Sequence, residues 1–81
     1  MNTYANLNGN SNVIRYYYCD DYIIVEFKSG LERFYRYDKK QIGETEFYRL
    51  IMMADRGYGL NGALSRKDHP NYSNKGNSCE I

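Results

Sequence analysis

The sequence predicts an α+β fold: a three-stranded antiparallel β-meander packed on one main α-helix, with a short C-terminal helical turn. Three observations predict it. Turn signals divide an aromatic and β-branched stretch into three segments. After this stretch, the spacing of apolar residues changes from the period of a strand to that of a helix. The chain has 81 residues, which is enough for one small domain.

The first predicted strand, residues 13–19, ends at two adjacent aspartates that signal a turn. In the second predicted strand, residues 22–27, alternation places Ile23, Val25 and Phe27 on one face and Glu26 on the other, so we expect Glu26 at the surface. A Lys-Ser-Gly turn leads to the third strand, residues 31–37. Because the connections are short, the three strands are expected to pair in chain order.

The predicted helix follows from apolar residues at helical spacing, beginning at Phe47 and ending at Ala54. Thr45 is expected to cap the start of this helix, and Gly57 suits a left-handed position at its end. A short second helical turn is expected next, with Asn61 as its N-cap.

The ends of the chain are polar and lack a hydrophobic period. We therefore expect residues 1–10 to be a flexible lead-in and residues 67–81 to be a flexible polar tail. Residues 11–66 form the predicted single domain.

Composition excludes several functional classes. The net charge is +1, which disfavours binding to long nucleic acids but allows a local phosphate contact. His69 is the only histidine, and the two cysteines lack the spacing of metal ligands, so neither a metal, nor a cofactor, nor an enzyme is expected. No signal-peptide pattern and no membrane-spanning apolar stretch occur, so a cytoplasmic location without a membrane partner is expected.

Four short motifs occur in a distinctive order. They are Ser11-Asn12-Val13 before the first strand, Phe27-Lys28-Ser29-Gly30 at the second turn, Tyr35-Arg36-Tyr37 in the third strand, and Ala54-Asp55-Arg56-Gly57 followed by Asn61. In this order they resemble the KTSC domain family, a small module named for the C-terminus of some lysyl-tRNA synthetases. The resemblance covers roughly residues 11–66. It implies a β-β-β-α fold, and RNA binding has been suggested for the family, whose members also occur alone in bacteria and phages.

Tyrosine dominates the predicted sheet. Ten residues are tyrosine, and six of these lie between Tyr16 and Tyr37, interleaved with arginines. Aromatic rings stack on bases and guanidinium groups hold phosphates. The candidate ligand-binding residues are Arg15, Tyr17, Arg33, Tyr35, Arg36, Tyr37, Arg56 and Asn61. Strand alternation is taken to place Tyr17, Tyr35 and Tyr37 with their arginines on one open face. The competing interpretation is that the rings are cross-strand pairs in the core.

Two functional hypotheses follow. The first is a small non-enzymatic module that binds a nucleotide or short single-stranded RNA; one version is a phage-type protein that sequesters a signalling nucleotide between protomers. The second is a protein–protein interaction module or inhibitor, using the tyrosine-rich sheet or a helix patch of Tyr48 and Met52. Such a patch also suits a homodimer, and its alternative explanation is packing against the lead-in.

Overall fold

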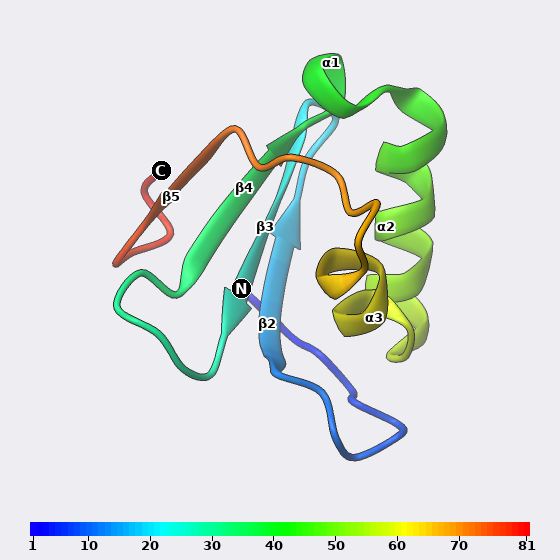
Figure 1. Cartoon of the computed structure of the whole chain (residues 1–81), viewed down its shortest axis with the longest axis vertical. Coiled ribbons are helices and arrows are strands. Elements are labelled where there is room, and N and C mark those ends of the chain that lie inside the picture. Colours follow the sequence, from blue (N-terminus) through cyan, green and yellow to red (C-terminus); the bar gives the residue numbers. More distant parts are fainter.

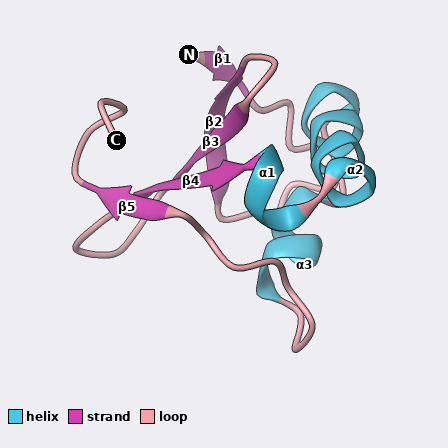
Figure 2. Cartoon of the chain, turned by 90° about the horizontal axis from the view of Figure 1, so that it is seen from above, coloured by secondary structure: helices cyan, strands magenta, loops and turns pink.

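The computed structural model describes all residues from 1 to 81. Five antiparallel strands form one sheet, in which the order in space is the order in the chain. The three helices lie on the same side of this sheet (Figures 1 and 2). Along the chain the elements are β1 (Asn2–Thr3), β2 (Val13–Tyr18), β3 (Tyr22–Phe27), β4 (Phe34–Asp38), α1 (Lys39–Ile42), α2 (Glu44–Arg56), α3 (Leu60–Ser65) and β5 (Asn74–Gly76).

The predicted α+β class, with an antiparallel sheet and helices packed on it, is confirmed, but the predicted number of three strands is wrong. Both additional strands come from the chain ends that were expected to be flexible. Strand β1 pairs with β2 next to Tyr16, and β5 pairs with β4 next to Tyr35. Strands of two or three residues carry no readable side-chain period, and they form through backbone hydrogen bonds.

Helix α2 is the predicted main helix, but it begins two residues earlier than a Thr45 cap would allow, so the predicted cap is wrong. Its N-cap is Gly43, and the single turn of α1 precedes it. The predicted left-handed helix end is confirmed, since Gly57 has a φ of 83° and its N–H donates to the carbonyl of Met53. Helix α3 is the expected second helical element. Its N-cap is Gly59, so Asn61 lies inside the helix and the predicted cap is wrong.

The core lies between the sheet and α2. Phe47 and Leu50 of α2 are fully buried together with Ile23 of β3. Burying each of these side chains contributes about 1.5–3 kcal/mol. Tyr4, from the N-terminal segment, also belongs to this core, and its hydroxyl accepts a hydrogen bond from the N–H of Leu60 at 3.3 Å. The N-terminal segment therefore helps to fix α3 against the rest of the molecule.

Candidate functional site

The register of the sheet divides the predicted tyrosine surface between two faces. Tyr17 pairs with Ile24 and Ile24 pairs with Arg36, so these three side chains share the face that points away from the helices. Tyr35 and Tyr37 lie on the helix side, packed on or within the core. The expectation that Tyr17, Tyr35 and Tyr37 share one face is therefore wrong. Alternation fixes the faces within a strand, but it does not fix the register between strands.

On the face away from the helices, three of the predicted phosphate ligands are paired with acidic side chains. Arg15 Nε donates to Glu26 Oε1, Arg33 lies 4.0 Å from Glu26 Oε2, and Arg36 Nε donates to Asp38 at 2.7 Å. Glu26 is only 2% exposed, so its predicted surface position is wrong. The hydrogen bond and the charge of Glu26 raise the pKa of Arg15 above its ordinary value. A phosphate would have to displace these carboxylates from the arginines.

Residues 77–81 return over this same face. Arg36 Nη1 donates to the carbonyl of Ile81 at 3.0 Å, and the Arg36 guanidinium lies 4.0 Å from the centre of the Tyr22 ring. A hollow of about 240 Å³ remains beside the segment. It is lined by Met1, Tyr17, Tyr22, Ile24 and Cys79. Tyr17 is 43% exposed here. The arginines on the same face, Arg15 and Arg36, already donate hydrogen bonds to carboxylates, so neither is free to bind a phosphate beside Tyr17.

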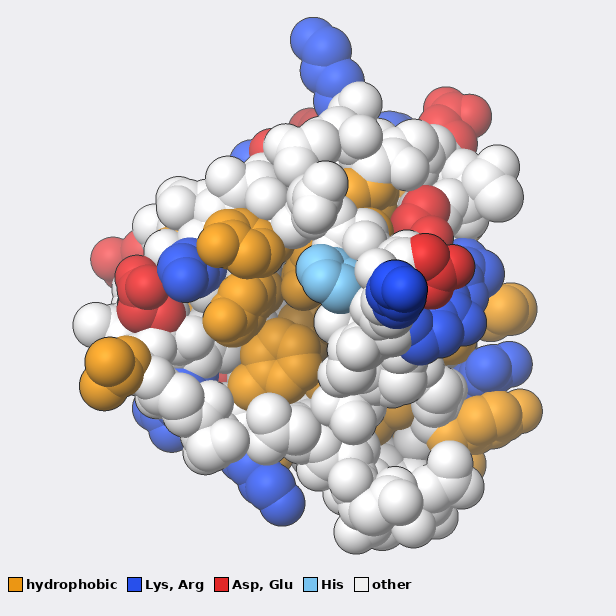
Figure 3. Space-filling model, in the orientation of Figure 1, with side chains coloured by type: hydrophobic (Ala, Val, Ile, Leu, Met, Phe, Trp, Pro, Cys, Tyr) orange, Lys and Arg blue, Asp and Glu red, His pale blue; other side chains and the backbone are white.

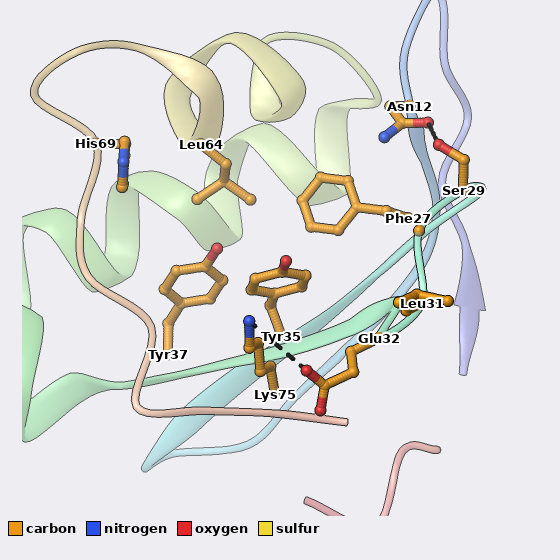
Figure 4. A pocket seen from close by; sticks show the side chains of 11 residues that line it. Asn12, Phe27, Ser29, Leu31, Glu32, Tyr35, Tyr37, Leu64, His69 and Lys75 are labelled. Atoms are coloured by element: carbon orange, nitrogen blue, oxygen red, sulfur yellow. Dashed lines mark hydrogen bonds and ion pairs between the residues drawn. The ribbon is translucent and has the colours of Figure 1, made fainter. Parts of the chain in front are cut away.

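A larger groove, of about 560 Å³, lies on the helix side of the sheet, between the β3–β4 loop, α3 and the segment after α3. Phe27, Tyr35 and Tyr37 reach it from the sheet, Leu64 from α3, and His69 from the following segment (Figure 4). Figure 3 shows hydrophobic side chains gathered over this side of the molecule, with a histidine beside them. Cavities of this volume hold small molecules in other proteins.

Phe27 and Tyr35 line the groove in edge-to-face contact, and Tyr72, which does not line it, packs against Tyr35. The ring of Tyr35 lies 5.3 Å from that of Phe27 and 5.1 Å from that of Tyr72, nearly perpendicular to both. Tyr37 is buried, and burial raises the pKa of its hydroxyl well above the ordinary value. The hydroxyl of Tyr37 therefore stays protonated further into the alkaline range than an ordinary tyrosine and can donate a hydrogen bond.

Polar groups stand at both ends of the groove (Figure 4). At one end, the hydroxyl of Ser29 lies 3.4 Å from Oδ1 of Asn12. At the other end, Nδ1 of His69 lies 2.9 Å from the carbonyl of Pro70, so Nδ1 carries a proton and donates to it. The groove thus combines apolar walls with hydrogen-bonding groups at its ends.

The rim also carries one ion pair. Nζ of Lys75 lies 3.6 Å from Oε1 of Glu32 and 5.5 Å from the centre of the Tyr72 ring. The electrostatic interaction with the Tyr72 hydroxyl, the hydrogen bond to that group and the charge of Glu32 raise the pKa of Lys75. Lys75 is therefore a positive charge at the rim of an aromatic groove.

The sequence pattern indicates Tyr35 and Tyr37 as site residues but does not indicate the residues that face them across the groove. His69, Tyr72 and Lys75 lie in the segment that was predicted to be a flexible tail. Strand β5 holds Tyr72 and Lys75 against β4, because Tyr35 pairs with Lys75 and the N–H of Ser73 donates to the carbonyl of Arg36. The only sequence signal was Tyr72 itself, the single aromatic residue in this polar stretch.

Arg56 and Asn61 lie apart from both faces, at the glycine-rich turn between α2 and α3. The guanidinium of Arg56 stacks on Tyr58 at 4.0 Å from the ring centre. Asn61 lines a separate hollow of about 260 Å³, together with Asn6, Asn8 and other residues of the N-terminal segment. The structure does not bring these two predicted ligand residues together with the sheet residues.

The helix patch of Tyr48 and Met52 is on the outer surface of α2, where these side chains are 54% and 53% exposed. Met53, by contrast, points into the core. The explanation that the patch packs against the N-terminal segment is therefore wrong, because both side chains are exposed and that segment contacts the helix at Gly57, its C-cap.

No group of three or more histidine, cysteine, aspartate or glutamate side chains is placed to hold a metal ion. None of the three helices has the length and apolar character needed to cross a bilayer. In comparisons with known proteins, no family model, no curated protein and no solved structure matches the chain. The resemblance to the KTSC family therefore stays a hypothesis.

Proposed function

We propose that this chain is a non-enzymatic binding module that takes a nucleotide, or a few nucleotides of single-stranded RNA, in the helix-side groove. The observation that carries the proposal is the aromatic wall of Phe27 and Tyr35, whose ring is supported by Tyr72, with polar groups at both ends of the groove and Lys75 at its rim. A base is a flat aromatic ring with a polar edge, and a nucleotide adds one anionic end.

Each part of a nucleotide has a matching part of the groove. The base packs against Tyr35, where aromatic contacts contribute about 1–3 kcal/mol per base. The amide of Asn12 and the hydroxyl of Ser29 supply donors and acceptors for the edge of the base. The near-neutral charge of the chain favours a small ligand over a long polymer.

Lys75 is the group that meets the phosphate, and Glu32 competes for it. In the free protein, Glu32 neutralises the ammonium group at 3.6 Å. A phosphate that binds Lys75 must replace this carboxylate or tolerate its repulsion. The ion pair therefore sets a cost on phosphate binding that can be measured separately from base stacking.

The proposal is tested by titrating the full chain with linear and cyclic nucleotides and with short RNA oligomers. A ligand that binds only the folded state raises the melting temperature, and calorimetry then gives its affinity. We expect at least one of these ligands to raise the melting temperature in a saturable way. The absence of any shift at millimolar ligand concentrations would contradict the proposal.

Variants of one residue locate the site. Tyr35→Ala is expected to weaken binding by about 5- to 150-fold, the equivalent of one stacked base, while the domain still unfolds cooperatively. Tyr35→Phe keeps the ring and should bind nearly as well as the original chain. Tyr17→Ala, on the opposite face, is the matched control. Loss of binding in Tyr17→Ala alone would move the site to that face.

The rim charge is tested with Glu32→Gln. This variant is expected to bind a nucleotide several-fold more tightly and to bind the corresponding nucleoside unchanged, because only the nucleotide carries a phosphate. Equal effects on the two ligands would show that Lys75 does not meet the phosphate. Unchanged binding of both would do the same.

A protein–protein interaction module is the second candidate function. The observation that favours it is the Tyr48 and Met52 patch, since tyrosine and methionine are enriched at protein interfaces. A stoichiometric partner protein, combined with a groove that binds no nucleotide, would favour this function over the first.

A further inference from the structure

Helix α2 carries a row of four exposed side chains on its outer surface: Glu44, Tyr48, Met52 and Arg56. They are spaced four residues apart, so they form one ridge along the helix. The ridge lies opposite the buried side of the helix, which includes Phe47. In Figures 1 and 2, neither α1, α3 nor the sheet covers this side of α2.

The order of chemical types along the ridge is acid, aromatic, thioether, base. Glu44 forms no ion pair within the chain. The partner of Arg56 is Tyr58: the Nε of Arg56 donates to the carbonyl of Tyr58, and the guanidinium stacks on the Tyr58 ring. The two charges are equally distant from Leu50 along the helix, and so are Tyr48 and Met52. A second, antiparallel copy of this ridge is therefore complementary to the first at every position.

We propose that this ridge is a self-association surface, on which a second copy of the chain docks about a two-fold axis that crosses the outer side of α2 at the level of residue 50. In this arrangement Glu44 faces the partner's Arg56 and Tyr48 faces the partner's Met52, each twice. Symmetric dimers use the same patch on both subunits, and this patch is complementary to itself. Ridges of residues four apart also pack into the grooves of a neighbouring helix.

The centre of the ridge is already ordered in the single chain. The ring of Tyr48 lies 5.3 Å from the ring of Phe47, and Nζ of Lys39 lies 5.8 Å from the centre of the Tyr48 ring. Ordering these side chains on association therefore costs less entropy than it would for a free side chain. Contact between a methionine sulfur and an aromatic ring is favourable, and here it forms at both central positions.

This surface is separate from the groove, which is built from the β3–β4 loop, α3 and the segment after it. The dimer therefore does not depend on the proposed nucleotide binding. Because one helix face provides less area than a typical stable interface, we expect a weak dimer, with a dissociation constant between about 1 µM and 1 mM.

The test is sedimentation velocity of the full chain over that concentration range, with two charge reversals. Glu44→Arg makes both ends of the ridge positive, and Arg56→Glu makes both ends negative. Each variant alone is expected to dimerise at least tenfold more weakly than the original chain. An equimolar mixture of the two should associate again, because every facing pair in the mixed dimer is then of opposite charge.

Two controls keep the result specific. Lys28→Glu changes the charge by the same amount at an exposed position in the β3–β4 loop, and should leave dimerisation unchanged. Met52→Gln keeps the charge and removes the central apolar contact, so it should weaken dimerisation even if a charge variant folds poorly. A thermal melt of every variant checks the fold. An original chain that stays monomeric at 1 mM, or a mixture of the charge variants that does not associate, would overturn the proposal.

Discussion

At the scale of single residues, Glu26 shows where the arginines of the sheet are used. Its carboxylate is almost fully buried, and an unpaired carboxylate in that position would destabilise the fold by about 3–5 kcal/mol. Arg15 and Arg33 compensate it while keeping about half of their own side chains in water. Arginine next to tyrosine in a strand therefore has a structural explanation in this chain, independent of any phosphate.

Asp55 is held by two tyrosines from one strand. The rings of Tyr16 and Tyr18 stack with 6.2 Å between their centres, and both hydroxyls donate to the carboxylate of Asp55, at 2.8 and 2.7 Å. Burial and the hydrogen bond to Asp55 raise the pKa of Tyr16 to about 12. The hydrogen bond to Asp55 also raises the pKa of Tyr18. These contacts tie β2 to the last turn of α2.

The raised pKa values predict a loss of stability in alkali. The folded state favours the protonated phenol of Tyr16, so this contribution is complete below pH 10 and is lost as the pH rises towards 12. The melting temperature should therefore fall over that interval. In the Asp55→Asn variant the melting temperature should start lower and fall less steeply with pH. Part of the fall remains, because burial still raises the pKa of Tyr16 and of Tyr37. A melting temperature that stays level to pH 12 in the original chain would contradict this prediction.

At the scale of elements, Gly57 joins the end of α2 to the N-terminal segment. Its φ of 83° is left-handed, and its carbonyl accepts a hydrogen bond from Leu7 at 2.8 Å. A Cβ atom at this position would lie 2.6 Å from the Cβ of Ala5. The absence of a side chain therefore serves both the helix end and the close approach of another segment.

Gly57→Ala is expected to lower the free energy of unfolding by about 2–5 kcal/mol, since backbone strain and the overlap with Ala5 add together. The matched control is Gly9→Ala, which has a similar φ of 79° but no atom within 4 Å of the added Cβ. This control should lose only the strain, about 1–2 kcal/mol. Urea denaturation measures both, and equal losses would mean that the N-terminal segment moves away without cost.

The elements that sequence predicted are those with a side-chain period. Helix α2 buries one face, which is visible as helical spacing, and β2 to β4 show as aromatic and β-branched segments between turn signals, although β3 buries both of its faces. Strands β1 and β5 have no buried side chains and depend on backbone pairing with β2 and β4. Such pairing leaves no trace in the side-chain pattern, so both strands were missed.

At the scale of the whole molecule, half of the groove could be predicted and half could not. Tyr35 and Tyr37 belong to a patterned strand and were selected from the sequence. Lys75 lines the groove, and Tyr72 packs on Tyr35, only because β5 extends the sheet at its edge. Tyr17 was grouped wrongly, because the register between β2 and β4 passes through β3 and is a property of the assembled sheet.

The last fifteen residues touch both faces of the sheet in succession. Tyr72 packs on Tyr35 on the groove side, β5 then forms the edge of the sheet, and Ile81 lies against Gly76 and the guanidinium of Arg36 on the opposite face. Two deletions of different length can therefore separate the contributions of the two faces.

Deleting residues 77–81 should uncover only the face away from the helices. We expect a small fall in melting temperature, stronger binding of a hydrophobic dye next to Tyr17 and Tyr22, and unchanged affinity for any nucleotide that binds the full chain. Deleting residues 72–81 also removes β5, Tyr72 and Lys75. It should lower the melting temperature further and weaken nucleotide binding, because Tyr35 loses its supporting ring and the groove loses the positive charge at its rim. Equal nucleotide affinity in both truncated chains would show that neither Tyr72 nor Lys75 contributes to binding of the ligand.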